Sequence, residues 1–275
     1  MDYRVLVDSC VDKHPLTQDE VRIPFTVNID GVPFVDLGET VIDQLNKIGF
    51  MAKSITTACP SPGDFISAIG DAKRAFIVTI SSKLSGAHAA AVAAHEQIKE
   101  RLRDACDVHI FDSKTACAGE TMVAIKLEQL LKENLSVDAI VDTMTRYIED
   151  LKTMFVLNSM DTLVANGRVK PIAGVAIKAM KICPIMGADK HGKIELLALA
   201  RGRAKAFNKM LDMIGETTRD LRECVLGITH VNALEKAQAL KEQICARYPF
   251  KDVLIFEAAG LSSVYASDGG IVLAY

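Results

Sequence analysis

The feature that most constrains the fold is the alternation of strand-like and helix-like segments in the first half of the chain. Residues 76–80 (FIVTI) form a continuous apolar run, which is typical of a strand buried on both faces of a parallel sheet. A helix-like segment follows over 86–103. Further strands are expected at 3–9 and 107–113, and further helices near 116–133 and 136–151. This alternation predicts a parallel sheet with helices on both faces.

The second half has a different order of elements, because strand-like segments follow one another without a helix between them. Residues 181–200 are expected to form two strands around a turn at 189–192. Other strand-like runs lie at 154–159, 224–230, 252–258 and 270–275, with helix-like runs at 172–180, 201–214 and 233–248. We therefore predict an N-terminal three-layer α/β/α domain with a parallel sheet (1–152), followed by a C-terminal two-layer α/β domain with a mixed sheet (153–275).

Composition and charge exclude several classes of partner and location. The formal net charge is −3, aromatic residues make up 5% and no basic run occurs, which argues against nucleic acid as a partner. The seven cysteines include no Cys-x-x-Cys pair, so we expect reduced thiols and neither a disulfide framework nor a metal site. The N-terminus lacks a signal-peptide core, and no apolar run is long enough to span a bilayer. These features predict a cytoplasmic protein without stable membrane insertion.

Polar residues collect where strand-like segments end. Four segments end in this way, at Asp8–Cys10, at Thr56-Thr57, at Ser81-Ser82 and at Asp112-Ser113. The carboxyl ends of parallel strands gather along one edge of a sheet, where ligands bind. Any one of these residues could simply cap a helix or a loop. Their coincidence in four segments favours a ligand-binding crevice.

Ser85 and Gly86 lie where the helix after residue 80 should begin. The first N–H groups of a helix are unsatisfied and its dipole is positive there, so an anion can bind, and glycine lets it approach the backbone. Hydroxyl groups rather than lysines surround this point, which favours a small singly charged group such as a carboxylate over a polyphosphate. The chain contains neither a Gly-x-x-x-x-Gly-Lys-Ser/Thr nor a Gly-x-Gly-x-x-Gly motif, which argues against a nucleotide.

The ordered motifs TTACPSPGDF, ISSKLSGAHAAA, HIFDSKTACAGE, LNSMDTLVANGRV and RGRAKA resemble the DegV family of bacterial fatty-acid-binding proteins over essentially the whole chain. The most specific parts are SSKLSG, the Thr57–Pro62 segment and RGRAKA. The resemblance implies a non-catalytic carrier that binds a long-chain fatty acid between two domains and needs no cofactor. In the family, the carboxylate is held by residues that correspond to Thr57 and Ser85, here assisted by the Gly86 backbone.

The resemblance also implies further contacts. Some members of the family present the bound fatty acid to a separate fatty acid kinase, and the arginines that correspond to Arg201 and Arg203 are linked to that step. Other candidate residues of the crevice are Ser82, Ser113, Arg168 and Ser267. For Arg168, bonding to loop carbonyl groups is an equally good interpretation.

The chain departs from the family pattern around the expected head-group site. Tyr265-Ala266-Ser267 stands where the family commonly has Gly-Ala-His, and the missing histidine bears on kinase coupling more than on lipid binding. Ala87 stands in place of a threonine, Ala58-Cys59 in place of Ser-Gln, and Asn166 in place of the first glycine of Gly-Gly-Arg. These replacements imply a less polar head-group pocket, or one suited to a different acid.

Two other functions remain open on the sequence. Ser85 with His88, or Ser82 with Asp112, could form the nucleophile and base of a serine hydrolase, although no Gly-x-Ser-x-Gly elbow is present. A phosphotransfer subunit could bind phosphate at the loop over 268–270, although a lysine-bearing glycine loop is absent.

Overall fold

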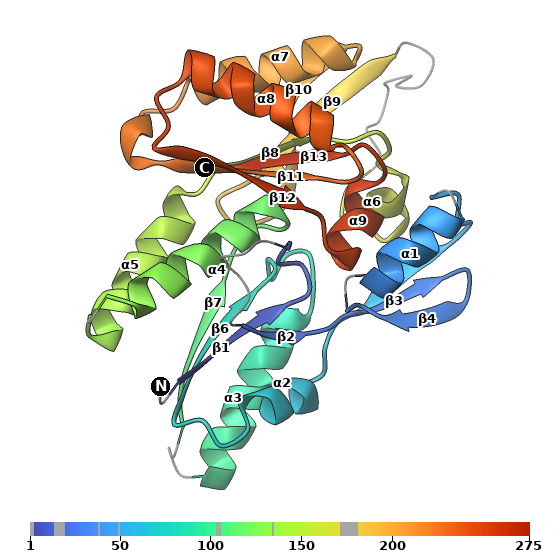
Figure 1. Cartoon of the computed structure of the whole chain (residues 1–275). Helices are drawn as coiled ribbons and strands as arrows, with labels where there is room; N and C mark the ends of the chain where they lie inside the picture. Colours follow the sequence, from blue (N-terminus) through green and yellow to red (C-terminus); the bar gives the residue numbers. More distant parts are fainter. Residues whose placement is uncertain are drawn as a thin grey trace.

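The computed structural model describes residues 3–13, 20–37, 39–48, 50–102, 106–133, 135–170 and 181–275. The helix expected over 172–180 lies outside these residues. The elements of the described chain form three sheets with helices packed against them (Figure 1).

The first sheet is parallel and has the strand order β2-β1-β6-β7. Its strands are β1 (Tyr3–Asp8), β2 (Val21–Ile23), β6 (Arg74–Thr79) and β7 (Asp107–Asp112). Helices α2 (Pro62–Ile69) and α3 (Ala87–Leu102) cover one face, and helices α4 (Ala118–Leu131) and α5 (Val137–Asp150) cover the other. The apolar run of β6 is buried on both sides, with Phe76 facing α4 and Ile77 facing α3. The predicted three-layer arrangement is confirmed.

The second sheet is mixed and has the strand order β10-β9-β8-β13-β11-β12. Its strands are β8 (Thr153–Val156), β9 (Ile182–Ala188), β10 (Ile194–Arg201), β11 (Val225–His230), β12 (Asp252–Glu257) and β13 (Ile271–Ala274). Only β11 and β12 pair in parallel, and the other pairs are antiparallel. Helices α7 (Arg203–Ile214) and α8 (Leu234–Arg247) pack against one face, so the predicted mixed sheet is confirmed.

Helix α4 lies between the two sheets. It packs on β6 of the parallel sheet and on β11 and β13 of the mixed sheet. Eleven of its 14 residues are buried, and they include Glu120 and Glu128 as well as apolar side chains. The two halves of the molecule therefore share this helix as part of a common core, and the division at residues 152 and 153 stays a prediction.

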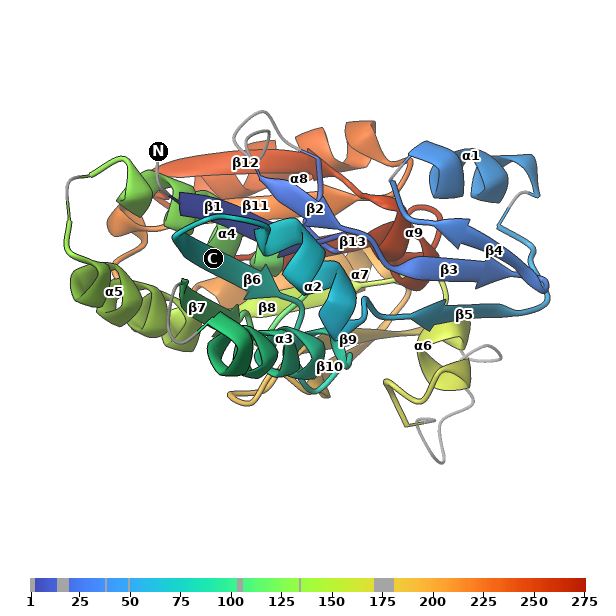
Figure 2. The ribbon, with the colours of Figure 1, turned by 90° about the horizontal axis from the view of Figure 1, so that it is seen from below.

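A third, antiparallel sheet has the order β4-β3-β5, built from β3 (Thr26–Ile29), β4 (Val32–Val35) and β5 (Ile55–Ala58). The turn between β3 and β4 has positive φ at Asp30 (51°) and Gly31 (88°), as a tight hairpin requires. Helix α1 (Glu39–Lys47) packs on this sheet. Figure 2 shows the small sheet beside the parallel sheet, close to the short helices α6 (Asp161–Ala165) and α9 (Gly260–Ala266).

The third sheet corrects one expectation from the sequence. Thr56 and Thr57 do not end a strand of the parallel sheet, because they lie within β5 and pair with Asn28 and Val27 of β3. The physical reason is the exposure of β5, whose residues alternate between partly buried and exposed, with none fully buried. Such a strand cannot occupy the interior of a sheet that is covered on both faces. None of the described helices is long and apolar enough to cross a membrane.

Candidate ligand-binding site

A cavity lies between the carboxyl edge of the parallel sheet and the inner face of the mixed sheet. Its walls come from both halves of the chain, and most are apolar, including Phe25, Ile80, Phe155, Leu163 and Val272. The cavity volume, measured as the space open to the centre of a water molecule, is about 90 Å³. One water needs roughly 10–15 Å³ by that measure, so the cavity has room for several waters or for a slender apolar ligand.

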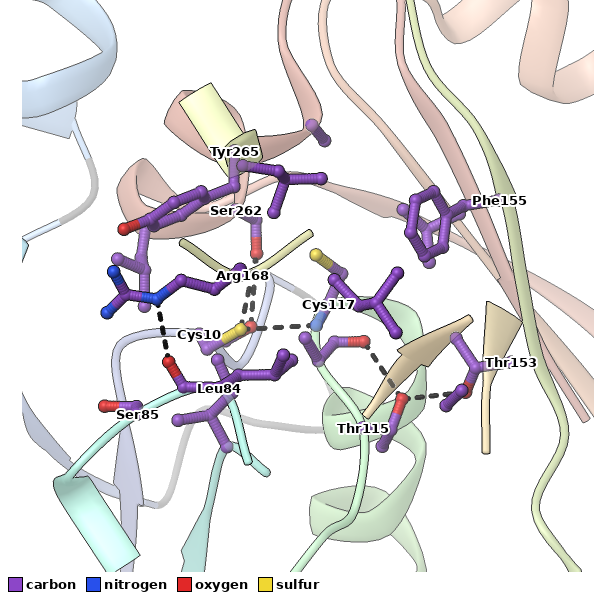
Figure 3. Close-up of a pocket in the computed structure, with 18 of the residues that line it drawn as sticks. Cys10, Leu84, Ser85, Thr115, Cys117, Thr153, Phe155, Arg168, Ser262 and Tyr265 are labelled. Carbon is purple, nitrogen blue, oxygen red and sulfur yellow. Dashed lines mark hydrogen bonds between the residues drawn. The ribbon is translucent and has the colours of Figure 1, made fainter. Parts of the chain in front are cut away.

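The polar groups of the cavity are concentrated at one end. Figure 3 shows Tyr265, Arg168 and Ser85 together on one side of the cavity. The hydroxyl groups of Tyr265 and Thr57 lie 2.8 Å apart and share a hydrogen bond. Thr57 reaches this point from β5, so it lines the cavity as predicted although its strand belongs to a different sheet.

Arg168 places a positive charge at the same end. Its Nε donates to the main-chain oxygen of Leu84 at 3.0 Å, and its Nη1 donates to the main-chain oxygen of Asn166 at 2.5 Å. The guanidinium carbon lies 5.9 Å from the centre of the Tyr265 ring. No carboxylate of the described residues pairs with this partly buried guanidinium. Both interpretations of Arg168 therefore hold, since it bonds loop carbonyl groups and also lines the cavity.

Ser85 and Gly86 occupy the start of α3, as the sequence predicts. The main-chain N–H of Ala87 donates to Ser85 Oγ at 3.2 Å, so the serine caps the helix while it lines the cavity. Gly86 itself does not line the cavity, and its main-chain N–H has no hydrogen-bond acceptor among the described residues. A Cβ at Gly86 would lie 3.1 Å from the Cys59 sulfur, so little room exists for a side chain.

The aspartates at the strand ends hold loops and do not face the cavity. Asp8 accepts hydrogen bonds from the main-chain N–H groups of Cys10 (2.9 Å) and Ile80 (2.7 Å). Burial raises the pKa of Asp8 to about 6, against the opposing effect of these two N–H groups. Asp112 accepts from the N–H groups of Ser82 and Lys114, both at 3.0 Å. These bonds fix the loops that follow β1, β6 and β7.

The structure does not bring all predicted crevice residues to the cavity. Ser82 contacts Asp112 through its backbone. Ser113 Oγ donates to the main-chain oxygen of Thr115 at 3.2 Å, and Ser267 Oγ accepts from the N–H of Ser159 at 3.3 Å. None of these three serines lines the cavity. Ser113 bonds within its own loop, whereas Ser82 and Ser267 join their loops to other segments of the chain. A sequence pattern cannot distinguish such a role from a binding role.

Other polar residues line the cavity without having been predicted as site residues. Thr115 and Thr153 share a hydrogen bond of 2.7 Å, and Figure 3 shows them on the side away from Ser85. Cys10 lies between these ends and accepts a hydrogen bond from the Cys117 N–H at 3.3 Å. Contact with Cys117, together with burial, raises the pKa of the Cys10 thiol. Tyr265 stood out in the sequence only as a departure from a family pattern.

The two arginines expected to contact a partner lie outside the cavity. Arg201 ends β10 and Arg203 begins α7, and both side chains are exposed. Neither forms an ion pair with a described residue. Both arginines could contact another molecule at the surface. Neither can contact a ligand inside the cavity, because neither lines it.

The geometry does not support the two alternative functions. His88 Nδ1 lies 3.3 Å from Thr79 Oγ1, so Thr79 and not Ser85 is the hydrogen-bond partner of this ring nitrogen. Asp112 is engaged by backbone N–H groups and no Ser82 hydroxyl contact forms. In the loop over 268–270, Lys236 donates to the Gly269 main-chain oxygen at 2.9 Å. Among the residues that the structure describes, no group of three or more His, Cys, Asp and Glu side chains could hold a metal ion.

Comparison with known families gives a match over almost the entire length. A family model described as an uncharacterised protein of the DegV family matches residues 3–275. The chain belongs to the DegV family. A DegV domain-containing protein of Streptococcus pneumoniae is 31% identical over 281 residues, which cover 100% of this chain and 99% of the relative.

Solved structures of the DegV family have the same fold. The Fatty Acid Kinase (Fak) B3 protein of Streptococcus pneumoniae, loaded with linoleic acid, superposes with a TM-score of 0.91 at 31% identity, covering 100% of this chain and 99% of that one. A DegV family protein of Ruminococcus gnavus with vaccenic acid gives a TM-score of 0.90 at 31% identity and covers 100% of both chains. This DegV protein therefore shares the complete two-part architecture of those structures.

Proposed function

We propose that this DegV protein is a non-catalytic carrier that binds a long-chain fatty acid in the cavity between its two halves. The observation that carries the proposal is the guanidinium of Arg168. It is partly buried at the end of an apolar cavity and has no carboxylate partner among the described residues. A buried charge is costly unless it is paired, so this position calls for an anion from a ligand.

The polar end of the cavity suits a carboxylate. The hydroxyl groups of Thr57 and Ser85, which line the cavity, would hold it. The N–H of the neighbouring Gly86, which has no acceptor among the described residues, would assist from the edge of the cavity at the start of α3. A hydrogen bond to a charged group contributes roughly 1.5–3 kcal/mol, so these contacts mainly orient the ligand. One guanidinium with neutral hydroxyl groups matches a single negative charge better than it matches a polyphosphate.

The apolar remainder of the cavity suits an alkyl chain. Removing a methylene group from water contributes ~0.8 kcal/mol, so a long acyl chain contributes roughly 10 kcal/mol before association costs. Those costs take back several kcal/mol. The chain of the ligand would therefore supply most of the affinity. The fatty acids in the two solved relatives, linoleic acid and vaccenic acid, support this class of ligand.

Presentation of the fatty acid to a separate kinase is the second part of the proposal. The name of the Streptococcus pneumoniae neighbour supports it, as do the exposed side chains of Arg201 and Arg203, which form no ion pair with a described residue. All seven cysteines are free, which fits a reducing compartment such as the cytosol. Kinase coupling would have to proceed without the family's histidine, because Ser267 occupies that position and its hydroxyl oxygen accepts from the Ser159 N–H.

The proposal is tested by titrating the delipidated protein with palmitic acid and with oleic acid. We expect saturable binding of one fatty acid per chain, with competition between the two. A protein that binds neither acid, while remaining folded by circular dichroism, would contradict the proposed function. Addition of a fatty acid kinase and ATP to the loaded protein would separately test whether the bound acid is phosphorylated.

A further inference from the structure

Tyr265 extends from α9 into the polar end of the cavity, where the sequence resemblance placed only Thr57 and Ser85. Its hydroxyl group lies 2.8 Å from Thr57 Oγ1. Its ring is next to the guanidinium of Arg168, whose carbon is 5.9 Å from the ring centre. Figure 3 shows the guanidinium between the Tyr265 hydroxyl and Ser85. The phenol is therefore within the same small region as the proposed carboxylate contacts.

At the polar end of the cavity, the hydrogens available for hydrogen bonding outnumber the hydrogen-bond acceptors. The paired hydroxyl groups of Thr57 and Tyr265 carry two hydrogens, and their mutual bond uses one of them. The other has no acceptor among the described residues. Ser85 Oγ already accepts from the Ala87 N–H, which leaves its own hydrogen to donate. Arg168 can only donate.

A ligand group that only accepts hydrogen bonds would satisfy this surplus. An ionised carboxylate is such a group, with two oxygens and about four lone-pair directions. When it binds, Thr57 and Tyr265 can each turn a hydrogen toward it without leaving either oxygen buried and unpaired. An alcohol brings a further hydrogen that itself needs an acceptor, and both an alcohol and an ester lack the charge that Arg168 would neutralise.

We infer that Tyr265 is a specificity-determining residue, whose hydroxyl donates directly to the ligand carboxylate and so selects free fatty acids over neutral lipids of the same chain length. The inference rests on the proposed function. It goes beyond that function because tyrosine replaces a position where the family pattern commonly has glycine, so the contact belongs to this chain and not to the general pattern.

The position of Tyr265 is fixed by packing around α9. This helix packs against α1 and against α6. Its start is tied by the Leu261 N–H, which donates to the buried carboxylate of Asp36 at 2.8 Å. The guanidinium beside the ring is held by the main-chain oxygens of Leu84 and Asn166. The phenol is therefore preorganised for a ligand at this end of the cavity.

The decisive variant is Tyr265→Phe, which removes the hydroxyl group and keeps the ring. The ligands are oleic acid and oleyl alcohol, which share one chain and differ in the head group. We expect Tyr265→Phe to weaken oleic acid binding by about tenfold to a hundredfold, the loss of one hydrogen bond to a charged group. Binding of oleyl alcohol should change by less than about threefold.

The matched control is Tyr248→Phe. The Tyr248 hydroxyl donates to the Leu211 main-chain oxygen at 2.8 Å and does not line the cavity. This variant loses the same chemical group and one hydrogen bond, so its affinities for both ligands should equal those of the unaltered protein.

A second comparison separates a direct contact from an indirect effect through Thr57. In a Thr57→Val background the bond between the two hydroxyl groups is already absent. If Tyr265 only held Thr57 in place, adding Tyr265→Phe would change nothing further. A direct contact predicts a further loss of about tenfold or more in oleic acid affinity.

The outcomes distinguish this inference from the proposed function. An unaltered protein that does not bind oleic acid would refute the proposed function itself. If that protein binds but Tyr265→Phe has no effect, or weakens acid and alcohol equally, the inference about Tyr265 is overturned. Loss confined to the acid, and retained in the Thr57→Val background, establishes it.

Discussion

Arg168 Nε donates a hydrogen bond to the main-chain oxygen of Leu84 at 3.0 Å, and this bond joins the two halves of the molecule across the polar end of the cavity. Arg168 follows α6, whereas Leu84 belongs to the loop between β6 and α3. The bond fixes the direction of the guanidinium. It also means that a substitution of Arg168 removes both a charge and a contact between the halves.

We expect Arg168→Met to weaken fatty acid binding by about tenfold to a hundredfold, because the carboxylate loses its charged partner. Arg168→Lys keeps the charge, but a single ammonium group cannot bond Leu84, Asn166 and a ligand with the same geometry, so an intermediate affinity is expected. Titrations at low and high salt would separate the two effects. Salt should weaken binding by the unaltered protein and leave Arg168→Met unaffected.

The head-group assignment predicts the behaviour of Thr57→Ala combined with Ser85→Ala. Two hydrogen bonds to a carboxylate are removed, so affinity should fall by at least a hundredfold. The protein should stay folded, with a loss of stability of about 0.5–2 kcal/mol because Ser85 caps α3. Ser82→Ala is the matched control, because Ser82 lies in the same loop but does not line the cavity. An unchanged affinity in the double variant would remove Thr57 and Ser85 from the site.

The buried Glu120 should make the stability of the protein fall as pH rises. Its side chain is fully buried on α4, close to the side chains of Asp8 and Cys10. Burial first, and the nearby Asp8 carboxylate second, raise the pKa of Glu120 well above its usual value. Between the unfolded pKa, about 4.3, and the raised folded pKa, the folded state binds more protons than the unfolded state. The contribution of Glu120 to stability is therefore fully present below about pH 4.3 and is lost as pH rises through the folded pKa.

Glu120→Gln tests this sign. The variant cannot ionise, so it should be more stable than the unaltered protein at pH 8 and nearly equal to it at pH 4. Urea unfolding at several pH values measures the difference. Glu133→Gln, at an exposed position, serves as the control and should show no such trend. A stability gain that does not grow with pH would contradict the account.

The close packing around Gly260 in α9 should affect ligand binding as well as stability. A Cβ at this first residue of α9 would lie 2.0 Å from Asp36 Oδ1 and 2.9 Å from Val41 Cβ. Gly260→Ala should therefore destabilise the fold by roughly 1–3 kcal/mol and weaken fatty acid binding, because α9 carries Tyr265. Gly63→Ala is the control, since its nearest neighbour, Ser61 Oγ, would be 3.6 Å away. Equal stability of the two variants would show that α9 tolerates displacement.

Much of the fold follows from local sequence. The apolar run of β6 and the hydroxyl-rich loop before α3 are adjacent in the chain, so their junction could be predicted from residues 76–90 alone. Ser85 was found for the same reason, since the capping and binding roles both require a hydroxyl group at the start of a helix. Local sequence also revealed the two strands around 189–192.

The rest depends on contacts between distant segments. The sheet that contains Thr57 is decided by its pairing with β3, about thirty residues earlier. Tyr265 reaches Thr57 across 208 positions of sequence, and nothing near Tyr265 indicates where α9 will pack. Ser113 and Ser267 were expected at the crevice but do not line the cavity. Each hydroxyl group bonds a main-chain group instead, Ser113 in its own loop and Ser267 at the distant Ser159.

The most direct test of the central claim is native mass spectrometry of the protein purified from a bacterial host, followed by solvent extraction of the bound material. We predict a mass increase that corresponds to one long-chain fatty acid per chain, with the same acid recovered in the extract. The increase should be absent from the variant that combines Thr57→Ala, Ser85→Ala and Arg168→Met. A ligand-free protein that also remains unbound after addition of palmitic or oleic acid would contradict the account.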